Sequence, residues 1–338
     1  MRKRSLTFAL LALALSCGSG KPADYLAKPD AWFDSAEGRR ITANILSWQT
    51  TLGSWPKNVD TTRRASAGGR AQSQGTFDNG ATTTEMRFLG RAFQATKDAR
   101  CEQAFLRGLD HILQAQFPTG GWPQYYPPSK QYHRHITFND DVMVRLMRLV
   151  RDVAESPAFA FVDARRREAA RSSFERGLDC ILKCQLRVNG RLTAWCAQHD
   201  ELDYQPRAGR AYELPSISGA ESAGVLELLM SVERPTPEII RAVHAGASWF
   251  AAAKVIGLRV ARVNGDKLVL RDPDAPPLWA RFYDLENGRP LFSDRDGVKK
   301  YDFNQLGSER RNGYAWYGDW GLRVEKRYAE WSKSHPRS

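Results

Sequence analysis

The chain has 338 residues, 42% of them hydrophobic and 26% charged, which is enough apolar material to bury the core of one large domain. This composition excludes a disordered chain. Lysine and arginine outnumber aspartate and glutamate by 12, so the protein should attract a polyanion such as nucleic acid, an anionic surface or an acidic polysaccharide. Ten tryptophans and eleven tyrosines exceed what a core needs and are typical of surfaces that bind sugar rings.

Residues 1–16 are predicted to form an export signal. Three basic residues at 2–4 precede an apolar run at 6–15 that is too short to cross a bilayer, and Ser16 is small, as a signal peptidase requires. Cleavage before Cys17 would leave either a free protein or a lipid-anchored one. We therefore expect an exported protein that is secreted, periplasmic or held at the outer membrane through a lipid on Cys17. No later stretch is apolar enough to predict a transmembrane helix.

The remaining cysteines and the paired histidines show no strong metal-binding pattern. Cys180 and Cys184 lie one helical turn apart without a second Cys or His pair nearby, and we interpret them as core thiols. Export permits a disulfide, but the cysteine spacing does not determine which pair would form it. His133 and His135 lack an evident third ligand, which disfavours zinc.

An internal repeat organises the chain. Residues 105–116 (FLRGLDHILQAQ) and 174–185 (FERGLDCILKCQ) share eight identities in twelve positions, 69 residues apart. A weaker copy lies 69 residues further on, around Gly246. An upstream copy is offset by 67 residues and aligns Trp55 with Trp122, each at the end of a Q-x3-G-x-W motif. A period of this length is typical of stacked helical hairpins.

A second helical stretch lies between the copies of the repeat. Apolar residues at helical spacing cover 80–96, 140–155 and 219–233, and Asn139 precedes the second stretch as a capping residue. Each period therefore contains two helices, neither of which can bury its apolar face alone. We predict a mainly α-helical protein in which three such hairpins form an (α/α)3 toroid.

The pattern changes after about residue 257. Two short alternating runs, 258–263 and 267–270, flank Asn264 and Gly265, which together are a strong hairpin signal. The rest of the tail is rich in turns and aromatic residues, and no Pro/Ser-rich linker separates it from the helices. We predict irregular short β-structure packed on the toroid, within a single domain spanning residues 17–338.

Polar residues gather at the beginnings of the second helices. Asp78 and Asn79 precede the first of these helices, Asp140 begins the next, and Ser218 and Glu221 lie at the third. Equivalent helix starts point to the same end of a toroid, so these carboxylates can converge on one cleft. Helix capping alone could explain each aspartate. Converging carboxylates suggest either an acid/base pair or a site for a hard cation with oxygen ligands.

Arginines in turns and loops beside aromatic residues favour an acidic substrate. Arg210 stands in GRAYELP, Arg281 in ARFYDL and Arg295 in SDRDG. Arg310 and Arg311 stand together in ERRNGY. Arginine is suited to fixed, often bidentate recognition of carboxylates. A solvated basic face is the alternative for any one of these positions.

Seven motifs follow one another between about Trp48 and Trp320. They are GTFDNGATTTEMRFL, QFPTGGWPQYYP, HITFNDDVM, LTAWCAQHD, RAYELPSISGAES, RPLFSDRDG and ERRNGYAWYG. In this order they resemble the pectate lyases of polysaccharide lyase family ten. The resemblance implies an (α/α)3 toroid, one catalytic domain and calcium-assisted β-elimination of polygalacturonate.

The chemistry of β-elimination explains why carboxylates and arginines would be needed at the site. The reaction removes the C5 proton beside the uronate carboxylate and expels the C4 oxygen, so negative charge accumulates on the carboxylate and a 4,5-unsaturated sugar remains. Ca²⁺ or arginine can stabilise this charge. The resemblance implies that Asp78 and Asp140 bind calcium and that Arg210 accepts the proton, although the pKa of a guanidinium is ordinarily above about 12. It also implies substrate contacts by Asn79, Arg295 and Arg311.

Other functions remain open from the residues alone. An exported protein that only binds acidic polysaccharide would share the charge and the aromatic content. An α-toroid glycoside hydrolase could use Asp78 and Asp140 as acid and base. The Q-x3-G-x-W pattern also occurs in triterpene cyclases, but no DxDD acid motif follows it. No nucleic-acid motif is present, so we expect polygalacturonate as the partner of a monomeric protein.

Three conspicuous side chains allow two interpretations each. Trp55 and Trp122 could stack on sugar rings or wedge adjacent hairpins together. His199, in LTAWCAQHD, could line the cleft or satisfy the polar groups of a turn.

Overall fold

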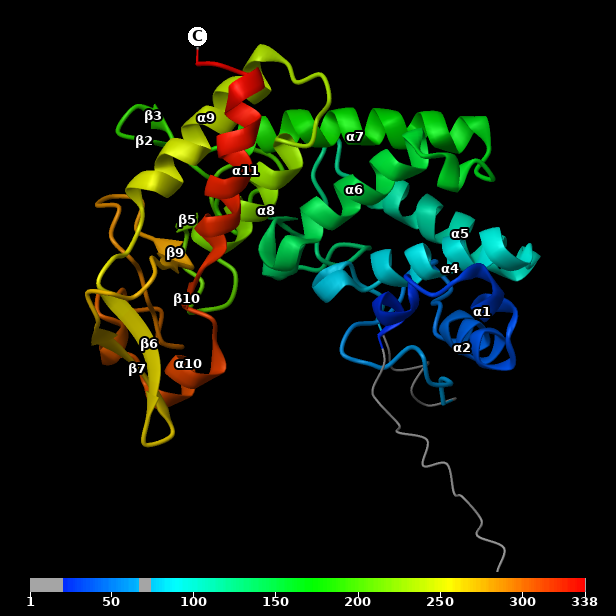
Figure 1. The fold of residues 1–338 in the computed structure, drawn as a ribbon, viewed down its shortest axis with the longest axis horizontal. Helices are drawn as coiled ribbons and strands as arrows, with labels where there is room; N and C mark the ends of the chain where they lie inside the picture. Colours follow the sequence, from blue (N-terminus) through cyan, green and yellow to red (C-terminus); the bar gives the residue numbers. More distant parts are fainter. Residues whose placement is uncertain (1–20, 67–73, 338) are drawn as a thin grey trace, which may run out of the picture.

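The computed structural model describes residues 21–66 and 74–337, so the predicted signal and Cys17 lie outside the described residues. Three helical hairpins follow one another in an arc (Figure 1). They are α4 (Thr83–Thr96) with α5 (Ala99–Ala115), α6 (Val142–Glu155) with α7 (Ala164–Cys184), and α8 (Gly219–Leu229) with α9 (Pro237–Ala252). The predicted (α/α)3 toroid of hairpins is confirmed.

The helices of the hairpins form two rows. One row contains α4, α6 and α8 side by side, and the other contains α5, α7 and α9. At one end α11 (Trp320–Ser334) packs on α8 and α9, and at the other α1 (Asp30–Asp34) and α2 (Ala36–Ser47) pack against α4. The stretches 80–96, 140–155 and 219–233 predicted from apolar spacing contain α4, α6 and α8.

Repeated glycines allow the two rows to approach closely. A Cβ at Gly177 would lie 2.1 Å from Met147 Sδ, and one at Gly108 would lie 2.8 Å from Met86 Sδ. Gly246 occupies the corresponding position in α9, where a Cβ would meet a leucine at 2.8 Å. Because close-packed side chains cannot interpenetrate, the helical repeat retains glycine where the rows touch.

Repeated glutamine and tryptophan side chains brace successive hairpins. Gln116 Nε2 donates to Ser173 O of the next hairpin at 2.9 Å. The indole N–H of Trp122 donates to Ile112 O at 2.9 Å. Trp55 and Trp122 are fully buried, at 0% exposure. A Cβ at Gly177 of α7 would lie 3.4 Å from the Trp122 ring, so this tryptophan fills the space between two hairpins. Neither ring has a face exposed to a sugar.

The C-terminal part has the predicted irregular β-structure. Strands β6 (Leu258–Val263) and β7 (Asp266–Arg271) pair antiparallel around Asn264 and Gly265, whose φ angles are 50° and 84°. Positive φ at both turn positions is what an Asn-Gly hairpin requires. This part also contains α10 (Ser308–Gly313), and its β6–β7 hairpin and α10 lie below α8 and α9 in the view of Figure 1. A small aromatic cluster that includes Trp316 forms its own core.

The other described strands are two-residue antiparallel pairs. They are β1 (Ile136–Thr137) with β4 (Gln198–His199), β2 (Arg187–Val188) with β3 (Arg191–Leu192), β5 (Ile217–Ser218) with β9 (Phe282–Tyr283), and β8 (Trp279–Ala280) with β10 (Tyr317–Gly318). Short 3-10 turns complete the chain: η1 (Pro22–Tyr25), η2 (Asp78–Gly80), η3 (Tyr132–Arg134), η4 (Asn139–Asp141), η5 (Pro157–Phe159) and η6 (Phe303–Gln305).

The cysteines of the described residues are buried thiols. Cys101, Cys180, Cys184 and Cys196 form no disulfide with one another. This agrees with the interpretation of the Cys180 and Cys184 pair as core residues. Within residues 21–66 and 74–337, no helix combines the length and apolar character needed to cross a membrane.

Candidate active site

The repeated tryptophans position the segments that lead into the next helices. Trp122 O accepts from Thr137 N at 3.0 Å, and Trp195 O accepts from Ser218 N at 2.7 Å. Because α6 and α8 begin just after these segments, their starts are fixed beside each other. Turn η4 packs against both η2 and α8. The prediction that the starts of the second helices share one rim is confirmed.

Turns η2 and η4 are two versions of one structure. Asn79 and Asp140 hold corresponding positions, with φ of 53° and 52°, in the left-handed region that Asn and Asp tolerate best among residues with a side chain. Their neighbours Asp78 and Asn139 are buried, at 2% and 6% exposure. In η2 the aspartate is therefore buried and the asparagine is exposed. In η4 the asparagine is buried and the aspartate reaches solvent.

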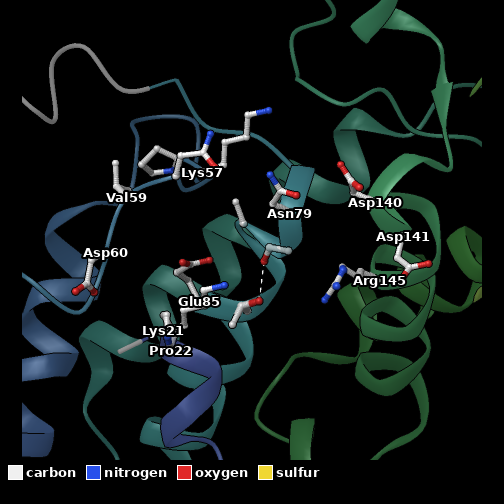
Figure 2. A pocket seen from close by; sticks show the side chains of 15 residues that line it. Lys21, Pro22, Lys57, Val59, Asp60, Asn79, Glu85, Asp140, Asp141 and Arg145 are labelled. Atoms are coloured by element: carbon white, nitrogen blue, oxygen red, sulfur yellow. Dashed lines mark hydrogen bonds between the residues drawn. The ribbon is translucent and has the colours of Figure 1, made fainter. Parts of the chain in front are cut away.

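A cleft of about 720 Å³ opens along these two turns. Figure 2 shows Lys57 and Asn79 on the side of the N-terminal segments, and Asp140, Asp141 and Arg145 on the side of α6. The volume lies within the range of about 300–1,000 Å³ that is usual for ligand sites. The cleft combines carboxylate, amide and cationic groups, which suits a substrate that is both polar and charged.

Both carboxylate oxygens of Asp78 already have a donor. The ammonium of Lys57 pairs with Oδ2, and the backbone N–H of Asn79 donates to Oδ1 at 3.0 Å. The Asp78 side chain is 3% exposed, and that of Lys57 is 26% exposed. Lys57 also lies 5.7 Å from the centre of the Tyr125 ring, where a cation is attracted to the ring face.

A buried network surrounds Asp140. Its Oδ2 accepts from Asn139 Nδ2 at 2.8 Å, and its Oδ1 accepts from Arg281 Nη2 at 3.3 Å. Arg281 also pairs with Glu221, which accepts a second bond from the Ser218 hydroxyl. Burial raises the pKa of Glu221 although Arg281 lowers it. Burial opposes the charge of Arg281, but its anionic neighbours outweigh burial and hold the pKa above its ordinary value. Arg281 is thus a fixed cation.

Arg210 lies in an aromatic cluster that reaches Arg281. Its Nη2 is 2.5 Å from Glu213 Oε1, and its guanidinium lies 5.1 and 5.5 Å from the ring centres of Tyr212 and Tyr314. The Tyr314 hydroxyl donates to the same Glu213 oxygen at 2.6 Å, and Arg281 lies 4.8 Å from the Tyr314 ring. Tyr314 therefore connects the Arg210 pair with the network around Asp140.

The structure brings Arg295 to this cluster but not Arg311. Arg295 lies 5.7 Å from the Tyr212 ring and pairs with Glu309 at 3.0 Å. Arg311 pairs with Asp266 of β7, which fastens α10 to the β-hairpin. The substrate contact predicted for Arg311 gains no support from this position, because its guanidinium is already engaged within the C-terminal part.

The sequence did not single out several residues of the site, among them Arg145 of α6. Glu213 stands three positions after Arg210 in RAYELP, a spacing that permits an ion pair, and Tyr314 lies within the motif NGYAWYG. Lys57 directly follows the first Trp-Pro pair. These positions lie in or beside motifs, but only the folded chain shows which partners they meet.

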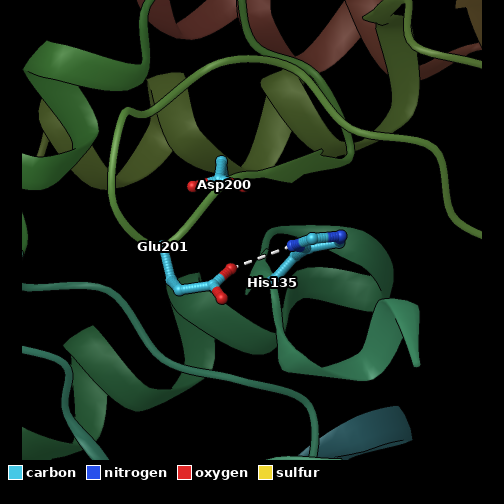
Figure 3. Close-up of side chains that lie close together, drawn as sticks. All are labelled: His135, Asp200 and Glu201. Carbon is cyan, nitrogen blue, oxygen red and sulfur yellow. Dashed lines mark hydrogen bonds and ion pairs between the residues drawn. The ribbon is translucent and has the colours of Figure 1, made fainter. Parts of the chain in front are cut away.

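A second group of ligand-type atoms lies apart from these residues. Atoms of His135, Asp200 and Glu201 all lie within 4.8 Å of one another, and His135 Nδ1 is 3.0 Å from Glu201 Oε2 (Figure 3). Arg134 pairs with Glu201, and Arg207 pairs with Asp200 at 2.9 Å. Two arginines oppose the binding of a cation. We interpret the group as a brace between two loops, and His133 takes no part in it.

His199 serves the turn in which it stands. It is fully buried, accepts from Cys196 N at Nε2 over 3.1 Å and donates from Nδ1 to Tyr204 O over 2.7 Å. Burial lowers its pKa to about 4, so the ring is neutral near pH 7. Both ring nitrogens are satisfied, so the interpretation of His199 as a cleft residue is wrong.

The helical toroid thus carries a cleft lined by carboxylate, amide and cationic side chains, and Asp140 of this cleft pairs with the fixed cation Arg281. The sequence model of the Pectic acid lyase family matches residues 49–325. No curated protein sequence matches the chain. The chain belongs to the Pectic acid lyase family and is a polysaccharide lyase.

Solved structures show the same relationship. The family 10 polysaccharide lyase from Cellvibrio cellulosa is 36% identical, with a TM-score of 0.81 over 94% of this chain and 98% of its own. An aspartate-to-alanine mutant of a family 10 polysaccharide lyase from Cellvibrio cellulosa, in complex with trigalacturonic acid, is 35% identical, with a TM-score of 0.80 over 94% of this chain and 97% of its own.

Proposed function

We propose that the protein is a pectate lyase that cleaves polygalacturonate by calcium-assisted β-elimination to 4,5-unsaturated oligogalacturonides. The observation that carries this proposal is the chain of contacts from Asp140 through Arg281 and Tyr314 to Arg210, which sets carboxylate and fixed cations together. The trigalacturonic acid bound to a related enzyme supports a polygalacturonate substrate. A polymeric substrate also supports export, which stays a prediction for the signal and Cys17.

The donor set of the two turns fits calcium. Asp78 and Asp140 offer carboxylate oxygens, and Asn79, which lines the cleft, offers an amide oxygen. These are the hard ligands that Ca²⁺ prefers. Within this set we assign Asp78 and Asp140 as the residues that would hold the ion. Bound calcium would stabilise the negative charge that develops on the uronate carboxylate.

Arginines of the site would orient the substrate. Arg281 cannot move far, because Glu221 and Asp140 hold it and 10% of its side chain is exposed. Arg295 is 66% exposed and can reach a bound carboxylate. Fixed and mobile cations together would place the uronate carboxylate so that the C5 proton faces Arg210. Arg281 and Arg295 would increase the rate by holding the substrate in the reactive orientation, and they would take no part in breaking or forming bonds.

Arg210 must lose a proton before it can accept one. Burial opposes its charge, but Glu213 outweighs burial and keeps the pKa of Arg210 above its ordinary value. The 2.5 Å contact offers a route: transfer of a proton from Nη2 to Glu213 Oε1 leaves a neutral guanidine that can take the C5 proton. Arg210 lowers the pKa of the Glu213 carboxyl against the effect of burial, so this transfer is uphill. This transfer leaves the number of protons bound by the pair unchanged, so it does not depend on pH. Loss of the Arg210 proton to solvent is the alternative route, and turnover that increases toward alkaline pH would identify it.

The ultraviolet absorbance of the unsaturated product tests the proposal. The mature protein is incubated with polygalacturonate in the presence of calcium or of a chelator. We expect the absorbance to rise with calcium and not with chelator. Reducing ends without this absorbance would identify a glycoside hydrolase, and binding without either signal would identify a polysaccharide-binding protein.

Matched variants assign the metal ligands. We expect Asp140→Asn and Asp78→Asn to lose most turnover, whereas Asp179→Asn, an exposed aspartate of α7 paired with Lys183, should behave as wild type. Circular dichroism checks the fold of each variant. Full activity with unchanged calcium dependence in either site variant would remove that residue from the proposed metal site.

A further inference from the structure

Both acids proposed to hold calcium carry a cationic partner from the chain itself. Lys57 pairs with Asp78, and Arg281 pairs with Asp140 at 3.3 Å. Carboxylates neutralised in this way attract a divalent cation less strongly than free ones, because the cation must approach a second positive charge. Calcium can therefore bind Asp78 fully only if the ammonium withdraws.

Lys57 and Arg281 differ in their freedom to withdraw. Arg281 is bound to a second buried acid, Glu221, and its departure would leave that acid unpaired. Among the described residues Lys57 pairs with one carboxylate, that of Asp78, and its side chain is 26% exposed. It lines the same cleft as Asn79 and Asp140 (Figure 2). A lysine ammonium on a flexible four-carbon stem can change partner where a buried arginine fork cannot.

We propose that Lys57 holds Asp78 in the metal-free protein, that calcium displaces its ammonium, and that the freed ammonium then binds a uronate carboxylate in the cleft. This inference rests on the proposed function. It assigns Lys57 two successive partners of the same chemistry, a carboxylate of the protein and a carboxylate of the substrate. When both calcium and substrate are bound, the uronate carboxylate neutralises the Lys57 ammonium in place of Asp78.

The exchange couples the two ligands. Calcium frees Lys57 for the substrate, and the substrate draws Lys57 away from Asp78 and so favours calcium. Thermodynamic linkage makes the two effects equal: each ligand strengthens the binding of the other by the same factor. A variant without the ammonium should bind calcium alone more tightly, bind substrate less tightly and lose this coupling.

Isothermal titration with calcium alone tests the first step without measuring activity. We expect Lys57→Met to bind calcium roughly tenfold more tightly than wild type, within the usual range of coupling between sites. Lys57→Arg keeps the positive charge and should stay near wild type. Lys254→Met is the matched control, because Lys254, just after α9, is 31% exposed and pairs with Glu325 of α11 at 2.7 Å. It should leave the calcium affinity unchanged.

A second titration in the presence of trigalacturonate tests the coupling. Trigalacturonate should increase the calcium affinity of wild type and leave that of Lys57→Met almost unchanged. Lys57→Gln, which loses the charge but keeps a hydrogen-bond donor, should behave like Lys57→Met and replaces it if that variant does not fold.

Two results would overturn the proposal in distinguishable ways. If wild type binds calcium and neither uncharged variant binds it more tightly, the displacement of Lys57 is refuted while the calcium-assisted lyase stands. If no variant binds calcium, with or without trigalacturonate, both the displacement and the calcium role in the proposed function fail.

Discussion

Glu85 makes the stability of the protein depend on pH in a direction opposite to that of an ordinary paired acid. Glu85 is 5% exposed, and its Oε1 accepts from Thr61 Oγ1 at 3.0 Å, while Oε2 has no hydrogen-bond partner among the described residues. Burial raises its pKa from the ordinary 4.5 to about 7. Between these two values the folded protein keeps a proton that the unfolded chain has lost. Stability therefore falls as pH rises from 4.5 to 7.

The size of the effect follows from the same interval. The difference between the ordinary pKa and the raised one corresponds to about 3 kcal/mol of unfolding free energy, with about 1.4 kcal/mol for each tenfold change in proton affinity. Glu85→Gln removes the titrating group at nearly constant volume. The difference in unfolding free energy between this variant and wild type should therefore become more favourable to the variant by about 3 kcal/mol when the pH is raised from 4 to 8.5.

Urea unfolding of the two proteins at both pH values measures this gain. Glu175→Gln, an exposed position of α7, is the control and should show no change with pH relative to wild type. The reasoning would be refuted if the difference in unfolding free energy between Glu85→Gln and wild type were the same at the two pH values, because Glu85 would then carry the same protonation in the folded and unfolded states.

Three further predictions concern the site and its scaffold. Arg210→Lys keeps the charge but loses the planar fork, so kcat at saturating polygalacturonate should fall by about 10²–10⁴-fold, the usual contribution of an acid/base group, and a near-normal kcat would remove Arg210 as the base. Arg295→Lys should mainly raise KM in the same steady-state assay, and an unchanged KM would exclude a carboxylate contact. Gly177→Ala should cost about 1–3 kcal/mol in urea unfolding, because its Cβ would lie 2.1 Å from Met147 Sδ, and wild-type stability would mean that the two helix rows separate easily.

Local pattern was sufficient to predict the helical scaffold. Helical periodicity depends on residues three and four positions apart, and the repeated Gln, Gly and Trp positions lie within one hairpin or at its junction with the next. The contacts of Gln116 and Trp122 show why the pattern repeats, because the same brace is needed at each junction. The β6–β7 hairpin was predictable for the same reason, since Asn264 and Gly265 alone supply the two positive φ angles.

The candidate site was predictable only as a set of residue types near helix starts. Asp78 and Asp140 could be placed on one rim because their turns occupy corresponding places in two repeats. Which of the paired Asp and Asn residues faces the cleft depended on backbone conformation, and η2 and η4 bury Asp78 but present Asp140.

Tertiary structure alone decided the partners of the charged groups. Lys57 and Asp78 are 21 positions apart, and Arg281 and Asp140 are 141 positions apart, so no local pattern links them. Arg311 stands in a motif like the others, but its pair with Asp266 directs it into the C-terminal part. Two charged side chains pair when they are close in space and partly buried. The sequence gives only the identity and the order of the residues. The chain's repeat thus determined the scaffold, and the packing of that scaffold decided which charges meet.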